Sequence, residues 1–98
     1  MITNTVYIVI GYICENPADL WGVAVYDSEE HAQIHLQKAS TTAKRIQNNI
    51  SRANKLRGQP FSEEQLQQFR ASNQYDPHMR FSDNVIYKVL QAPKFTIE

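Results

Sequence analysis

The sequence has little of several features that whole classes of protein require. A single cysteine, Cys14, has no partner for a disulfide within the chain. Three glycines and four prolines among 98 residues are too few for collagen or for a low-complexity disordered chain. The glycines form no phosphate-binding loop, and no serine lies in a Gly-x-Ser-x-Gly pattern. These absences exclude a disulfide scaffold and a fibrous protein, and they argue against several common enzyme classes.

Long apolar runs and net charge are also missing. The longest strongly apolar run, residues 6–14, is about half of the roughly twenty residues that a membrane-spanning helix needs. Ten basic and ten acidic side chains cancel. The apolar residues, 42% of the chain, suffice for one compact core. We therefore expect a soluble, cytoplasmic protein with no membrane partner, folded as a single domain over residues 1–98.

The zero net charge conceals a segregated pattern. Residues 1–30 contain five acidic side chains and no lysine or arginine. Residues 31–62 contain six basic side chains and no acidic one, and residues 63–98 are nearly balanced. A basic segment in a neutral protein indicates either an anionic partner or a solvated helix face.

Three segments have the composition of β-strands. Residues 5–14 are rich in Val, Ile and Tyr and almost continuously apolar, which is typical of a central strand covered on both faces. Residues 21–26 form a second strand, after a turn of about six residues that contains Pro17. Residues 85–91 form the third strand, which we expect Pro93 to end.

Two segments are predicted to be helical, one long and one short. Asp27 or Ser28 can cap a helix over residues 28–56, which Gly58 stops. Its apolar residues are spaced alternately by four and three, and they form a seam: Ala32, Leu36, Ala39, Ala43, Ile46, Ile50 and Ala53. A capping box that begins at Ser62 starts a short helix over residues 63–71. The segment between this helix and the last strand is predicted to be a polar loop.

The order strand-strand-helix-helix-strand predicts an α+β fold, with a three-stranded antiparallel sheet in the order 2-1-3 and both helices on one face. The long helix, at roughly 43 Å, exceeds strands of about 20 Å. We expect the second helix, a second copy or a partner to cover its overhanging end. The other face of the sheet also needs a cover, either Phe95 and Ile97 near the C-terminus or another molecule.

Few residues are arranged for catalysis or for metal binding. His31 and His35 lie four residues apart on the long helix, which is half of a metal site that His78, Cys14 or an acidic side chain would have to complete. Cys14 ends an apolar strand, where a thiol usually behaves as a small hydrophobe. We therefore expect no enzyme activity and no cofactor, and keep a small metal-dependent enzyme built on the three histidines as a lesser hypothesis.

The most distinctive surface feature is the basic side of the long helix. Its bases are Lys38, Lys44, Arg45, Arg52 and Lys55. Such a ridge can dock on an acidic protein surface or follow the phosphates of a nucleic acid. The neutral charge of the domain and the lack of a helix-turn-helix or RNA-binding aromatic motif favour a protein partner, with nucleic acid as the alternative. Trp21 is expected to be the most exposed large aromatic and to join the binding surface.

Three stretches of the chain carry a resemblance. They are Val6-Tyr7-Ile8-Val9, then GVAVYDSEEHA from Gly22 to Ala32, then Tyr75-Asp76-Pro77 followed by Ile86-Tyr87-Lys88-Val89. Together they resemble small uncharacterised accessory proteins of phages and prophages, which have a VYVV strand, a GVF-S-S-E-E-x-A strand-to-helix junction, a YDP loop and a Y-x-V strand. The resemblance implies no active site. It implies a phage protein that binds a host protein or complex in the host cytoplasm, for example as an inhibitor of an antiviral defence system, in the manner of an anti-CRISPR protein.

Self-association is compatible with either kind of partner. The small alanines of the seam, the overhanging helix and the opposed charge blocks of residues 1–30 and 31–62 predict a homodimer.

Overall fold

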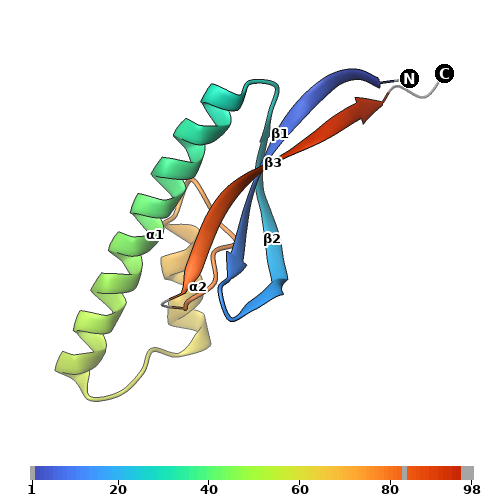
Figure 1. Cartoon of the computed structure of the whole chain (residues 1–98). Helices are drawn as coiled ribbons and strands as arrows, with labels where there is room; N and C mark the ends of the chain where they lie inside the picture. The colour runs from blue at the N-terminus through green and yellow to red at the C-terminus, as the bar shows by residue number, and fades with distance from the viewer. Residues whose placement is uncertain (1, 83, 96–98) are drawn as a thin grey trace.

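The computed structural model describes residues 2–82 and 84–95, which form one sheet and two helices (Figure 1). In chain order the elements are β1 (Ile2–Ile13), β2 (Asn16–Tyr26), α1 (Glu29–Arg57), α2 (Glu63–Ala71) and β3 (Val85–Phe95). The sheet has the order β2-β1-β3, and β1 is antiparallel to both neighbours. Neither helix, within the described residues, has the length and apolarity of a membrane span. The predicted α+β fold and its sheet order are confirmed.

The middle of the central strand is buried on both faces, as its continuous hydrophobicity predicts, whereas Ile8 and Tyr12 beside it are half-buried. Side chains alternate between the two faces of a strand, so Val9 and Ile10 point in opposite directions. They are 0% and 5% exposed. Val9 faces α1, which packs against all three strands.

The strand ends differ from the prediction in two places. The turn between β1 and β2 consists only of Cys14 and Glu15, not of six residues, because Pro17 lies near the start of an edge strand, where its missing N–H is tolerated. For the same reason Pro93 does not end β3. It pairs with Thr5, and the strand continues to Phe95 on the other edge of the sheet.

Helix α1 begins and ends where the capping signals place it. The side chain of Ser28 accepts a hydrogen bond from the His31 N–H at 3.3 Å. Gly58 has a φ of 74°, the left-handed conformation in which its N–H bonds back to the Asn54 carbonyl. Within the predicted seam five residues are buried, namely Ala32, Ala39, Ala43, Ile46 and Ile50, while Leu36 and Ala53 are half-buried.

The second helix covers the far end of α1. Phe61, Leu66 and Phe69, on and beside α2, pack against a core cluster that includes Ile46 and Ile50. Figure 1 shows α2 beside the lower half of α1, level with the lower end of the sheet. Of the three covers considered for the overhang, the second helix of the same chain packs there, while Leu56 near the end of α1 is 85% exposed.

A two-stranded ribbon leaves the body of the domain at the opposite end (Figure 1). Strand β2 ends at Tyr26, opposite Tyr7, whereas the pairing of β1 with β3 continues to Ile2 and Phe95. Phe95 is 59% exposed on this ribbon, so it does not cover the open face of the sheet. Ile97 lies outside the described residues.

Candidate binding surface

The bases predicted from the sequence share the outer side of α1. All five are exposed: Lys38, Lys44, Arg45, Arg52 and Lys55. They lie away from the buried seam, and we call them the basic face. Among the described residues none of them forms an ion pair, whereas Arg70 pairs with Glu63 and Arg80 with Asp19. Lys38 Nζ lies 5.6 Å from the centre of the Tyr75 ring, a cation–π contact at one end of the face.

Trp21 does not belong to this face, and the expectation that it is exposed is wrong. It is 8% exposed because the strand register pairs it with Gly11 and turns its ring toward the helices. Gly11 leaves the space that the ring occupies. A Cβ at this position would lie 2.5 Å from Cζ2 of Trp21. The indole therefore packs into the fold at the point where β1 has no side chain.

The indole N–H of Trp21 donates a hydrogen bond to a buried carboxylate. Asp76 is 0% exposed, and its Oδ2 accepts hydrogen bonds from Trp21 Nε1 at 2.9 Å and from the Tyr87 hydroxyl at 2.7 Å. Its Oδ1 accepts from the His78 N–H at 3.3 Å. The carboxylate thus ties β2, β3 and the loop after α2 together. Buried carboxylates need such donors, because burial without them is costly.

The loop that supplies Asp76 is held in shape by Asn73, which is also 0% exposed. Its Oδ1 accepts from the backbone N–H groups of Tyr75 and Asp76, and its Nδ2 lies 3.3 Å from the sulfur of Met79. Asparagine is suited to this role because its amide can replace backbone partners in a turn. The predicted polar loop is therefore part of the core.

Burial, together with the hydrogen bond to Asp76, raises the pKa of Tyr87 well above its ordinary value. In the unfolded chain a tyrosine ionises near pH 10, so above that pH the folded state holds the proton that the unfolded state has lost. Below about pH 10 the contribution of this group to the free energy of unfolding does not change with pH. As the pH rises further, the free energy of unfolding falls by about 1.4 kcal/mol per pH unit.

We expect wild type to lose stability more steeply than Tyr87→Phe between about pH 9 and pH 11, because only wild type carries this group. Urea unfolding at several pH values measures the two slopes. Parallel slopes would contradict the proposed linkage, whatever the constant difference in stability between the two proteins.

His35 is engaged in structural contacts. His35 Nε2 lies 2.8 Å from the Tyr75 carbonyl oxygen, and Nδ1 lies 2.8 Å from the Tyr26 hydroxyl. A carbonyl only accepts, so Nε2 carries the proton, and in a neutral ring the Tyr26 hydroxyl donates to Nδ1. Across residues 2–82 and 84–95 no three His, Cys, Asp or Glu side chains are grouped to hold a metal ion, and His31 and His78 complete no such site with His35.

The face of the sheet away from the helices is apolar and open. Its side chains are Ile8, Ile10, Tyr12, Leu20, Val25, Ile86, Lys88 and Leu90. Leu20 and Val25 are 52% and 63% exposed. Lys88 Nζ lies 5.1 Å from the centre of the Tyr12 ring. In the region where all three strands form this face, Lys88 is the one charged side chain among the described residues. Exposed apolar patches of this kind usually mark a contact surface.

No family model, curated protein or solved structure matches this chain.

Sequence reasoning located the basic face but missed the Asp76 network. Two features of the sequence were clues to this network. Asn73 stands three residues before the pair Asp76-Pro77, a pattern typical of a turn. Trp21 and Tyr87 each need a hydrogen-bond acceptor if they are buried. Nothing in the local pattern identified which acceptor they would reach.

Proposed function

We propose that this chain is a phage-derived protein without catalytic activity that binds a host protein or complex through the basic face of α1. The observation that carries the proposal is five exposed bases, none of which is paired with an acid among the described residues. They stand on a helix that is capped at both ends and packed along its other side. A fixed row of unneutralised cations attracts an acidic surface and orients it before contact.

The resemblance to phage accessory proteins supports the biological part of the proposal. Its YDP motif supplies Asp76, and its strand-to-helix junction supplies the Ser28 cap, so both shared motifs have a part in this fold. The proposed setting is the cytoplasm of the host, and the proposed outcome of binding is inhibition of an antiviral defence component.

Charge reversal of the basic face is the test. We expect the double variant Arg45→Glu/Arg52→Glu to lose at least about tenfold in affinity for the host partner, because attraction becomes repulsion at two contacts. Its helical circular dichroism should be unchanged, since both side chains are exposed. The measurement is capture from nuclease-treated host extract followed by titration of the captured protein.

Lys94→Glu is the control, because it reverses a base on β3 that lies neither on α1 nor where all three strands form the open face. The proposal requires a protein that wild type and Lys94→Glu retain and that the double variant loses. Equal retention by all three would show that the basic face is not the binding site.

Nucleic acid binding is the alternative use of the same face. Five phosphate contacts would give a slope of about −4.5 when the logarithm of affinity is plotted against the logarithm of salt concentration. A captured protein that disappears on nuclease treatment, together with this salt dependence for pure DNA or RNA, would replace the protein partner by a nucleic acid.

A homodimer is a further part of the proposal. What supports it is the open face of the sheet, which is apolar except for Lys88 and so is chemically best matched by a second copy of itself. Light scattering on the purified protein should give twice the mass of one chain, and the mass of a single chain would contradict the dimer.

A further inference from the structure

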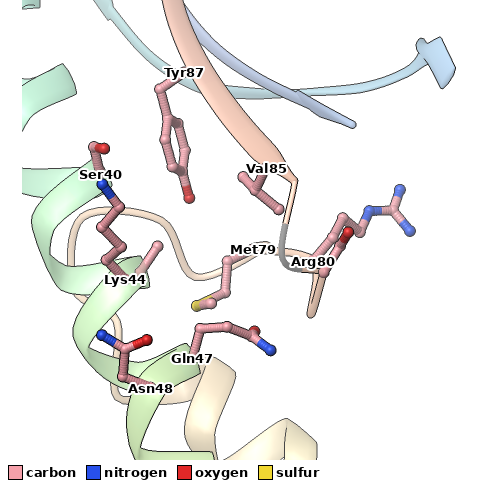
Figure 2. Close-up of a pocket in the computed structure, with 10 residues that line it drawn as sticks. Ser40, Lys44, Gln47, Asn48, Met79, Arg80, Val85 and Tyr87 are labelled. Atoms are coloured by element: carbon pink, nitrogen blue, oxygen red, sulfur yellow. The ribbon is translucent and has the colours of Figure 1, made fainter. Parts of the chain in front are cut away.

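A cavity of about 290 Å³ lies between α1, the start of β3 and the segment that precedes it. Figure 2 shows its two sides: Lys44, Gln47 and Asn48 come from α1, and Met79 and Tyr87 face them from the loop and from β3. Neither the resemblance nor the basic face assigns a role to this cavity.

One wall of the cavity is apolar. Ala43, Met79, Val85 and the ring of Tyr87 line it, and Met79 is 1% exposed. The Asp76 network holds this wall in place, because Tyr87 donates to Asp76 and Asn73 contacts the Met79 sulfur. The wall is therefore built to receive a hydrocarbon group without rearranging.

The charge of the cavity comes from Lys44. Its side chain extends over the cavity toward Ser40 (Figure 2), and it has no acidic partner among the described residues. Arg80 also lines the cavity, but its guanidinium pairs with Asp19 at 3.6 Å and lies over the Trp21 ring at 5.5 Å. The cavity thus offers one available cation beside an apolar wall.

Besides the apolar wall and Lys44, the cavity is lined by the amide of Gln47. Its Oε1 is buried and has no hydrogen-bond donor. A buried acceptor without a partner is uncommon in folded proteins and costly to keep. Gln47 lines the cavity, so this oxygen is an acceptor at its wall that lacks a donor in the described structure.

We propose that the cavity binds a small organic carboxylate with an apolar body and a hydroxyl group. The carboxylate pairs with Lys44, the body packs against Met79 and Tyr87, and the hydroxyl donates to Gln47 Oε1. This site shares Lys44 with the basic face, but the cavity can be tested with the purified chain alone, without the proposed host partner.

The methionine methyl groups provide the test. The chain has two methionines, Met1 and Met79, so a ¹³C-methyl-methionine sample gives few signals, one of which comes from the cavity wall. We expect 4-hydroxybenzoate and 6-hydroxyhexanoate, at millimolar concentration, to shift the Met79 signal saturably. Benzoate and phenol, which each lack one polar group, should bind about tenfold more weakly than 4-hydroxybenzoate.

Two variants separate the site from general charge. Lys44→Gln should weaken binding of 4-hydroxybenzoate about tenfold, whereas Lys55→Gln, on the same helix but outside the cavity, should not change it. No Met79 shift with either hydroxycarboxylate would overturn the proposal. A shift of the same size with inorganic phosphate, or equal binding by Lys44→Gln, would also overturn it.

Discussion

Replacing Asp76 with alanine is expected to lower the free energy of unfolding by about 2–6 kcal/mol, since each of two buried donors that loses its acceptor costs roughly 1–3 kcal/mol. The donors are the Trp21 N–H and the Tyr87 hydroxyl, at 2.9 and 2.7 Å from the same oxygen. The free energy of unfolding of a small domain is about 5–15 kcal/mol in total, so the variant should be only marginally stable. Urea unfolding followed by circular dichroism and by Trp21 fluorescence measures the loss.

Asp27→Ala is the matched control, because Asp27 is an exposed carboxylate just before α1. It should change stability by no more than about 0.5 kcal/mol. Asp76→Asn keeps an acceptor oxygen but not the charge, so its free energy of unfolding should lie between those of Asp76→Ala and Asp27→Ala. If Asp76→Ala and Asp27→Ala unfolded at the same urea concentration, the network would have no role in holding the loop to the sheet.

Adding a single methyl group at Gly11 is expected to cost about 2–5 kcal/mol, because overpacking and the loss of a hydrogen bond to a carboxylate add together. In Gly11→Ala the new Cβ would lie 2.5 Å from the Trp21 ring, so the ring has to move. Movement breaks the bond from Nε1 to Asp76 and disturbs the edge-on contact with Tyr87, whose ring centre is 6.4 Å away. The fluorescence of Trp21 should shift to longer wavelength as the ring gains solvent.

Gly22→Ala provides the comparison within the same sheet. Gly22 pairs with Ile10, and a Cβ there meets nothing within 4 Å. Alanine restricts the unfolded chain, so this variant should match wild type or gain up to about 1 kcal/mol. Equal stability of Gly11→Ala and Gly22→Ala, with unchanged Trp21 emission, would show that the ring does not depend on the space at Gly11.

The helices and the burial of β1 could be predicted because their signals are local. The seam of α1 repeats along one side of the helix, and Ser28 and Gly58 cap its ends through bonds that span three or four residues. The basic face follows from the same periodicity, since a residue opposite the seam is exposed in any compact arrangement. The ends of β2 and β3 could not be placed, because the tolerance of proline depends on which strands lie at the edges.

The Trp21 site was misplaced for a different reason. Its exposure depends on the partner that the strand register puts opposite, and that partner is Gly11. The acceptor that makes its burial favourable, Asp76, lies 55 residues further along the chain. No local pattern encodes either contact, although each residue is visible in the sequence.

Local patterns in the chain predict the α+β class, the element order, the capped helices, the central position of β1 and the placement of five bases on one side of α1. These properties depend on periodicity and on bonds between near neighbours. The burial of Trp21, the place of Asp76 and Asn73 in the core, and the cavity beside Lys44 arise only on tertiary packing. Those outcomes depend on groups that are distant in the chain and meet only when the sheet, the helices and the loop after α2 have packed together.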